Sequence, residues 1–205
     1  HSSTLFPYTT LFRSKQLPQH YFSRLWRAII EFDLIEENDK ILIGLSGGKD
    51  SMFLAFALSK LRDFGPRRFQ LAAFTVDPMF SPDFNTAKIQ NFCTSLNIPF
   101  YTSQVDIASV IASQKNKNAC FSCAYFRRGA VNNFALKLGF NKVALAHHHD
   151  DAVETFLMSL LYSGQLKTFL PKTYLDRTGL TVIRPLIYFR EKELRGTPKL
   201  HGFDP

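Results

Sequence analysis

The chain has 205 residues, of which 45% are hydrophobic and 20% charged, a composition that indicates a globular protein of about one α/β domain rather than a disordered chain. It carries 25 Lys and Arg against 17 Asp and Glu, so its net charge is +8 and a polyanion is the partner class that this balance favours. Three cysteines are too few for a disulfide framework. The apolar runs are too short for a membrane-spanning helix, so no membrane partner is expected.

The two ends of the chain are expected to lie outside the folded domain. Thr4–Ser14 (TLFPYTTLFRS) resembles a translated sequencing adapter, so residues 1–14 are taken as a non-native segment, with a disordered native arm as the alternative. Residues 15–39 are expected to form an N-terminal helical segment and residues 40–195 the main domain. Residues 196–205 are interpreted as a truncated C-terminal end, because a helical pattern begins near Arg195 and then stops.

Helical and strand-like segments alternate along the chain. Apolar residues at helical spacing predict a helix over Tyr21–Glu37, and short apolar runs predict strands. We expect strands at Lys40–Leu45, Phe69–Val76, Phe100–Ser103 and Lys142–Ala146, helices at Met52–Phe64, Asn85–Asn97, Val105–Ser113, Ala124–Leu138 and Asp150–Tyr162, and a hairpin of Tyr174–Asp176 with Leu180–Arg184. This order predicts an α/β fold with a doubly wound, mostly parallel sheet and helices on both faces.

The hexapeptide Ser46–Ser51 (SGGKDS) stands between an expected strand and an expected helix. Its glycines allow a tight turn with outward N–H groups, and a helix N-terminus adds positive potential, so the context favours a phosphate site. Ser46 and Ser51 can bond phosphate oxygens and Lys49 adds charge, whereas Asp50 is best explained there as a Mg²⁺ ligand. The spacing differs from a Walker A loop, and a plain glycine-rich turn is the alternative.

Cys120 and Cys123 form a C-x-x-C pair. Two thiolates at this spacing reach one metal ion or each other, so we expect a metal or redox role, with two structural cysteines as the alternative. A closed metal or iron–sulfur site needs further ligands. Cys93 falls on the apolar face of an expected helix, which favours a small buried side chain over a ligand.

A third cluster, His147–Asp151 (HHHDD), follows the fourth expected strand, at the edge where open α/β sheets bind ligands. Imidazoles and carboxylates suit a site for Mg²⁺ and phosphate, or acid–base chemistry. Asp150, Asp151 and Glu154 also suit the N-terminus of the next helix through its dipole. That capping role explains the acids without a ligand, but it does not explain three consecutive histidines.

Four segments of the chain resemble, in order, the TtcA group of tRNA thiolases within the PP-loop, or N-type ATP pyrophosphatase, superfamily. They are SGGKDS, CFSCAYFRRG, LAHHHDDAVETFLMSLLYSGQLKTFLPK and TVIRPLIYFREKEL. The resemblance runs from Leu34 to Leu194 and implies an adenine nucleotide alpha hydrolase-like fold, that of the PP-loop ATPases. The C-x-x-C before Arg-Arg-Gly separates this group from the lysidine synthetases. Ala146, where the family usually has glycine, is a mild departure.

The resemblance also implies site residues. Mg²⁺ is expected on Asp50 and Asp151 and a [4Fe-4S] cluster on Cys120 and Cys123, and these four are the expected catalytic residues. The family has a third cluster cysteine after Arg-Glu-Lys-Glu-Leu, which this chain lacks, so we expect a truncated fragment that holds a cluster poorly. The residues expected to bind ATP are Ser46, Gly47, Gly48, Lys49, Asp50, Ser51, Asp77 and His148.

Basic residues around the C-x-x-C pair fit an RNA substrate. Between Ile107 and His149 the chain has no Asp or Glu, and its basic residues there are Lys115, Lys117, Arg127, Arg128, Lys137 and Lys142. Such a surface would contact RNA phosphates, with a solvated cationic helix face as the alternative. Arg127 and Arg128, just after Cys123, are the better candidates for contacts with RNA or with the cluster.

The implied activity is ATP-dependent tRNA thiolation, in which C2 of an anticodon-loop cytidine is adenylylated at its oxygen and the oxygen is replaced by sulfur by way of the cluster. The expected partners are tRNA and a persulfide or sulfide donor, in the cytoplasm, and a homodimer is allowed. A lysidine synthetase or a uridine 2-thiolase of the same superfamily is one alternative. A nucleotide- or metal-binding module without turnover is the other.

Overall fold

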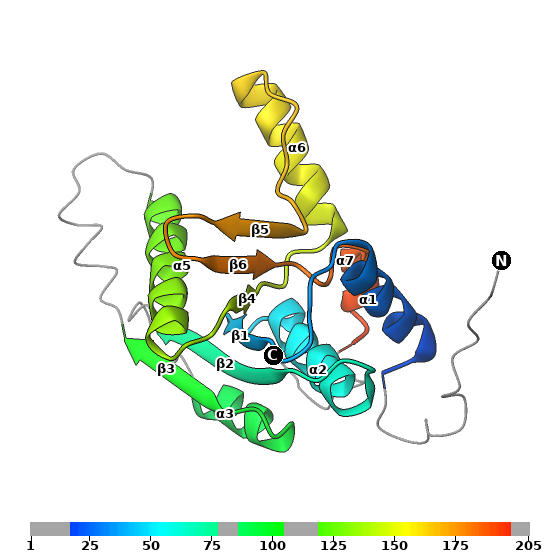
Figure 1. Ribbon diagram of the computed structural model, residues 1–205. Helices are drawn as coiled ribbons and strands as arrows, with labels where there is room; N and C mark the ends of the chain where they lie inside the picture. Colours follow the sequence, from blue (N-terminus) through cyan, green and yellow to red (C-terminus); the bar gives the residue numbers. More distant parts are fainter. Residues whose placement is uncertain (1–16, 78–85, 105–118, 198–205) are drawn as a thin grey trace.

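The computed structural model describes residues 17–77, 86–104 and 119–197 of the chain (Figure 1), with the side chains of residues 119–126 left out. Its strands are β1 (Lys40–Leu45), β2 (Gln70–Asp77), β3 (Phe100–Gln104), β4 (Lys142–Ala144), β5 (Lys172–Leu175) and β6 (Leu180–Ile183). Its helices are α1 (Gln19–Glu31), α2 (Lys49–Phe64), α3 (Thr86–Ser95), α5 (Ala119–Lys137), α6 (His149–Ser163) and α7 (Glu191–Leu194).

The strands form one six-stranded sheet in the order β3-β2-β1-β4-β6-β5. All neighbouring pairs are parallel except β5 and β6, which form an antiparallel hairpin with Leu175 opposite Leu180. The order reverses at β1, because β2 and β3 lie on one side of it and β4 on the other. Ligands of open α/β sheets bind outside the carboxyl ends of the strands at such a reversal, so the loops after β1 and β4 are where a site is expected.

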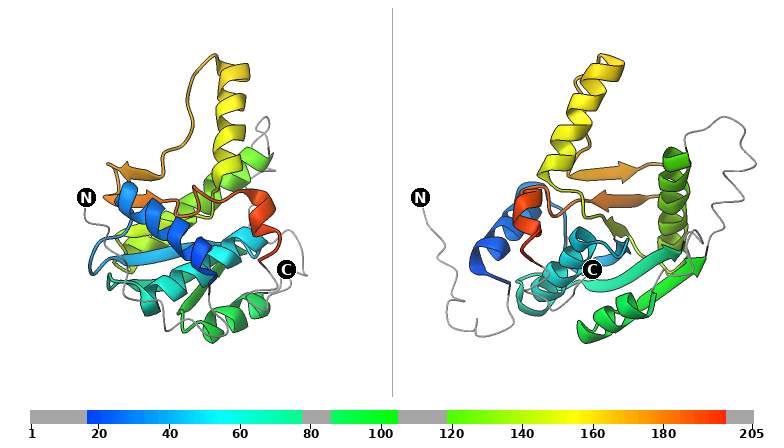
Figure 2. Two further views of the ribbon diagram at one scale, coloured as in Figure 1. Left: turned by 90° about the vertical axis from the view of Figure 1, so that its right-hand side faces the viewer. Right: turned by 180° about the vertical axis from the view of Figure 1, so that it is seen from behind.

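Two hydrophobic cores, one on each face, hold the sheet between helices. Alternate residues of β1 serve both, because Ile41 and Ile43 belong to one core and Leu42 to the other. The first core takes its helical residues from α1, α2, α3 and α7, and the second from α5, as Figure 2 also shows. Helices therefore cover both faces of a mostly parallel sheet, and the predicted fold class is confirmed.

Helix α6 departs from this layered packing. It projects away from the sheet in both figures, and the segment after it returns alongside, with the Thr168 hydroxyl donating to the Ala152 carbonyl at 2.7 Å. No residue of α6 is buried in the described structure. Large apolar side chains stay exposed there, among them Leu161 at 77% and Tyr162 at 83%. Among the described residues, no helix has the length and apolar character needed to cross a membrane.

The predicted elements that fall within the described residues are found, but several ends differ. The first helix stops at Glu31 rather than Glu37, because Asp33 adopts a positive φ of 48° and the Leu34 N–H bonds back to the Ile29 carbonyl at 3.0 Å. Helix α5 starts at Ala119 rather than Ala124, so the C-x-x-C pair lies inside it. The helix expected over Val105–Ser113 lies outside the described residues.

The prediction that Lys142 belongs to the cationic surface is wrong. Its side chain is only 4% exposed, and its ammonium lies 2.7 Å from a carboxylate oxygen of the equally buried Asp39. It also donates to the Leu34 carbonyl at 3.1 Å and to Glu36 at 3.0 Å. Lys142 is therefore a buried structural charge at the start of β4, where it ties the sheet to the segment after α1, and it is unavailable to RNA.

Replacing Lys142 by Met should lower the free energy of unfolding by about 3 kcal/mol, because Asp39 is left as a buried charge without its counter-ion. Urea unfolding measures the loss. Lys40→Met, at an exposed position of the neighbouring strand, is the matched control and should stay within about 0.5 kcal/mol of the wild type. Equal effects of the two substitutions would contradict the assignment.

The Cys93 thiol should resist alkylation in the folded protein. Cys93 is fully buried in the first core, and burial raises the pKa of its thiol to about 12. Because only the thiolate is nucleophilic, the thiol stays protonated and inert near neutral pH. Iodoacetamide treatment followed by peptide mass mapping should find Cys93 modified only after unfolding. Modification of the native protein at the denatured rate would show that this thiol is accessible.

Candidate functional site

The loop after β1 turns sharply and enters α2 at once. Gly47 has a φ of +82°, and a Cβ placed there would lie 3.2 Å from Cδ1 of Ile89, so glycine fits this position for both backbone and packing reasons. Gly48 is the N-cap residue in extended conformation, and Lys49 already begins the helix. The predicted start at Met52 was three residues late. The motif therefore places the positive end of a helix and its free N–H groups at the carboxyl edge of the sheet.

The two serines of the motif have different surroundings. Ser51 is only 4% exposed; its hydroxyl donates to the Gly48 carbonyl at 2.9 Å and accepts from the Ser46 N–H at 3.2 Å. Ser46 is exposed, and its hydroxyl lies 3.1 Å from that of Ser51. Ser51 thus braces the loop from inside, and Ser46 is the serine that faces outward.

Lys49 is held between two carboxylates. Its ammonium donates to Asp50 at 3.1 Å and to Glu191 of α7 at 3.4 Å. Burial alone would lower the pKa of Lys49, but its hydrogen bonds and attraction to Asp50 and Glu191 outweigh burial and raise it. The other oxygen of Asp50, Oδ1, is buried and has no partner among the described residues. Glu191 was missed as a site residue because it lies 142 residues away from Lys49, although it belongs to the segment TVIRPLIYFREKEL.

The His-Asp motif after β4 caps α6 and is hydrogen-bonded to the start of α7, which also contacts Lys49. Asp151 accepts the backbone N–H of the buried His148 at 2.8 Å, which confirms the capping role considered for it. Asp150 accepts the backbone N–H of Glu191 at 2.6 Å, and this hydrogen bond lowers the pKa of Asp150. Because Glu191 also contacts Lys49, the structure brings the glycine-rich motif and the His-Asp motif together through the first turn of α7.

The carboxylates do not by themselves form a metal-binding cluster. Among the residues that the structure describes, no three His, Cys, Asp or Glu side chains are grouped as metal ligands. Asp50 lies in the network of Lys49, whereas Asp151 is bonded to the start of α6. Asp77 ends β2 at the same edge of the sheet, opposite Gln104 of β3. The expected ligands therefore share one edge of the sheet but contact different partners.

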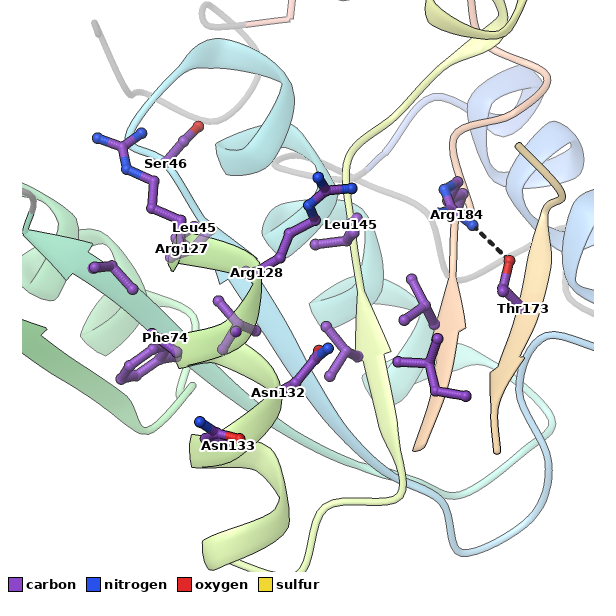
Figure 3. Close-up of a pocket in the computed structure, with 18 residues that line it drawn as sticks. Leu45, Ser46, Phe74, Arg127, Arg128, Asn132, Asn133, Leu145, Thr173 and Arg184 are labelled. Carbon is purple, nitrogen blue, oxygen red and sulfur yellow. Dashed lines mark hydrogen bonds between the residues drawn. The ribbon is translucent and has the colours of Figure 1, made fainter. Parts of the chain in front are cut away.

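A cavity of about 980 Å³ lies beside this edge, between α5 and the sheet (Figure 3). Its floor is mostly apolar, and its rim carries Ser46 at one end and Thr173 with Arg184 at the other. Arg127 and Arg128 enter it from α5. The apolar residues of the floor come from five strands and from the residue that follows β4, and they are Leu45, Phe74, Val76, Val143, Leu145, Leu175 and Val182.

Arginine charge dominates the cavity. The predicted Arg127 and Arg128 line it, and so does Arg184, which no sequence motif had marked as functional. Burial, followed by repulsion from Arg128, lowers the pKa of Arg184. Burial and then the charge of Arg184 also lower the pKa of His147, which favours its neutral form. Among the described residues that line the cavity, none is Asp or Glu.

The three cysteines divide between the two sides of the sheet. Cys120 and Cys123 lie one turn apart at the start of α5, whose later residues pack in the second core, and the structure does not describe their side chains. Cys93 lies in the first core, on the opposite face. The sheet separates Cys93 from α5, and its predicted role as a small buried side chain is confirmed.

Sequence comparison finds curated relatives that share much of this chain. The "tRNA-cytidine(32) 2-sulfurtransferase" of Cellvibrio japonicus is 36% identical over 178 residues, which are 86% of this chain and 59% of that protein. The protein of the same name from Nitrosospira multiformis is 38% identical over 178 residues, with the same two coverages. The chain thus spans about three fifths of the length of the curated relatives that it matches.

Comparison of structures finds the same fold in a tRNA thiolase and in a synthetase. The U34-tRNA thiolase NcsA from Methanococcus maripaludis, described with its [4Fe-4S] cluster, superposes with a TM-score of 0.74 at 22% identity, over 90% of this chain and 63% of that chain. NMN synthetase from Francisella tularensis gives 0.59 at 18% identity, over 92% and 72%. The PP-loop domain model matches residues 18–204, and since this range includes the whole sheet, the chain belongs to the PP-loop family.

Proposed function

We propose that the protein is an ATP-dependent tRNA sulfurtransferase that replaces the C2 oxygen of an anticodon-loop cytidine by sulfur. The observation that carries the proposal is the identity of 34–38% with proteins named tRNA-cytidine(32) 2-sulfurtransferase, over 82–93% of the chain. In the reaction, the C2 oxygen attacks the α-phosphorus of ATP and pyrophosphate leaves. Sulfide then attacks C2, and the adenylylated oxygen leaves as AMP.

The loop after β1 supports the nucleotide part of the proposal. The N–H groups at the start of α2, the exposed Ser46 hydroxyl and the Lys49 ammonium offer donors and positive charge to the phosphates of ATP. Lys49 is held near them by Asp50 and Glu191. Asp77 at the end of β2 and His148 at the N-cap of α6 are the proposed contacts to the rest of the nucleotide.

Mg²⁺ fits this site as an ion that is bound together with phosphates. Asp50 has a buried oxygen, Oδ1, without a hydrogen-bond partner in the described structure, which is the kind of donor that a cation would satisfy. Mg²⁺ usually takes one or two carboxylates and completes its shell with phosphate and water. We assign Asp50 as its first protein ligand and Asp151 as the second, and the ion would supply charge to neutralise the phosphates.

The cluster proposal rests on Cys120 and Cys123. Two thiolates one helical turn apart fit as two ligands of a [4Fe-4S] cluster, and the remaining cysteine of the chain, Cys93, lies across the sheet. A cluster held there would supply an iron atom to carry the sulfur to the base. Arg127 and Arg128 follow in the same helix and are the proposed RNA contacts. The sulfide or persulfide donor, the homodimer and the cytoplasmic location stay predictions.

The same superfamily offers two other tRNA products. A uridine 2-thiolase would use the same loop and cluster on another base, and a lysidine synthetase would use the loop without a cluster. The names of the curated relatives favour cytidine. Nucleoside analysis of tRNA treated with the protein separates the three products.

Thiolation is tested with the complete protein, which is prepared anaerobically and then incubated with tRNA, ATP, Mg²⁺ and sulfide. We expect 2-thiocytidine in the hydrolysed tRNA, measured by mass spectrometry, and pyrophosphate release that depends on tRNA. Cys120→Ala should abolish 2-thiocytidine and lower the iron content, because it removes a proposed cluster ligand. Cys93→Ala is the matched control and should keep both. Normal thiolation by Cys120→Ala would remove the cluster from the proposal.

Gly47→Ala should lower the free energy of unfolding by about 1–2 kcal/mol, because alanine is strained at a φ of +82° and its Cβ meets Ile89 at 3.2 Å. The misplaced loop should also weaken binding of a non-hydrolysable ATP analogue by roughly tenfold or more. Gly48→Ala is the control for stability, since Gly48 has a φ of −79° and its nearest contact is at 3.5 Å. Urea unfolding without nucleotide and calorimetric titration test the two effects. Equal losses of stability in both variants would refute the strain.

A further inference from the structure

Arg184 occupies a fixed position at the far end of the cavity from the glycine-rich loop. Its guanidinium carbon lies 4.9 Å from the centre of the Phe169 ring, and its Nη1 donates to the Leu170 carbonyl at 2.6 Å and to the Thr173 hydroxyl at 3.1 Å. Figure 3 shows it on the β6 side of the cavity, with the bond to Thr173. The segment after α6 and the β5–β6 hairpin thus hold this side chain before any ligand arrives.

The surroundings of Arg184 favour a bound anion. The Nε atom of Arg184 is buried and lacks a hydrogen-bond partner in the described structure. Arg128 lines the same cavity, between Arg127 and Arg184 in Figure 3, and its charge lowers the pKa of Arg184. No described carboxylate lines the cavity to balance these charges. Buried N–H donors and clustered like charges are both stabilised by a bound anion with several acceptor oxygens.

The anion at Arg184 is not the one expected on the glycine-rich loop. Arg184 follows β6 and Ser46 follows β1, and β4 lies between these two strands. Strands two places apart are separated by roughly 10 Å, so one phosphate group cannot contact both ends of the cavity. Lys49 of the loop also has its own carboxylate partners, Asp50 and Glu191, whereas no carboxylate lines the cavity beside Arg184 among the described residues.

The floor between the two ends fits a flat base. Val76, Leu145 and Val182 line it, and the Phe74 ring lies there as well, stacked on Phe134 at a centroid distance of 4.2 Å. Single-stranded RNA is recognised through bases laid on apolar or aromatic surfaces and through phosphates paired with arginine. A cavity with an apolar floor and an arginine end therefore fits one nucleotide of an unpaired RNA segment.

We propose that Arg184, with Arg128, binds a backbone phosphodiester of the RNA segment that carries the target base. This inference rests on the proposed function, because it takes the substrate to be tRNA. Arg184 acts as a positioning residue: it holds the nucleotide so that its base lies on the apolar floor, towards the loop that is proposed to bind ATP. The α-phosphate of ATP is the other phosphate group that Arg184 could bind.

The test measures binding rather than turnover. The probe is an unmodified anticodon stem-loop RNA with cytidine at position 32, titrated by fluorescence anisotropy across a series of KCl concentrations. Arg184→Gln should weaken RNA binding about tenfold and reduce the slope of log K against log salt by about 0.7–1, the value for one lost phosphate contact. Affinity for a non-hydrolysable ATP analogue should stay unchanged. Arg177→Gln, which removes an exposed charge from the turn of the same hairpin, is the matched control and should bind RNA as the wild type does.

Two results would overturn the proposal: equal RNA affinity of Arg184→Gln and Arg177→Gln, or a loss of nucleotide affinity with RNA affinity intact, which would assign Arg184 to the nucleotide phosphate. Circular dichroism checks the fold of each variant. If Arg184→Gln unfolds, Arg128→Gln on α5 tests the same site without touching the hairpin, and unchanged RNA binding there would refute it. Loss of RNA binding in a protein that forms no 2-thiocytidine would keep this site and reject the proposed chemistry.

Discussion

The reversal of strand order at β1 is the constraint on which the rest of the structure depends. β1 is paired on both edges, by β2 and β4, so its backbone hydrogen bonds are satisfied and its side chains must be apolar on both faces. The chain leaves its carboxyl end through Gly47 into α2. After β1 the chain continues to β2 and β3 on one side of it, and it later returns to β4, β6 and β5 on the other side. The loops after β1 and β4 therefore lie next to each other with no described helix covering the space between them.

Charge is distributed unevenly along this edge. Near the glycine-rich loop, Lys49 is balanced by Asp50 and Glu191, and Asp150 anchors the backbone of Glu191. Across the cavity, Arg184 is held by neutral groups such as the Leu170 carbonyl and the Phe169 ring. At the first end, carboxylates therefore outnumber the Lys49 ammonium before a ligand binds, whereas no described carboxylate lines the cavity beside Arg184. This difference in charge is the reason why different ligands are proposed for the two ends: a nucleotide with its cation, and the RNA backbone.

Local pattern predicted the elements well where the period was clear. β1 was predicted to the residue, and the β5–β6 hairpin was placed correctly around Gly179, because alternating or continuous apolar residues and turn residues are local signals. The end of α1 was missed, since the apolar Leu34 and Ile35 continue the pattern while Asp33 breaks the helix through its own φ. Lys142 was misplaced because its partner, Asp39, is far away in sequence.

The sequence by itself determined the alternation of strands and helices, the phosphate-binding turn, and the family that these motifs resemble. Each of these depends on residues that are close together along the chain. Only the tertiary structure decided that Glu191 contacts Lys49, that Lys142 is buried, and that Arg184 shares a cavity with Arg127 and Arg128. The physical reason is that strand order and helix packing, rather than local spacing, determine which distant side chains meet. Strand order and helix packing follow in turn from burying apolar residues in a core on each face of the sheet.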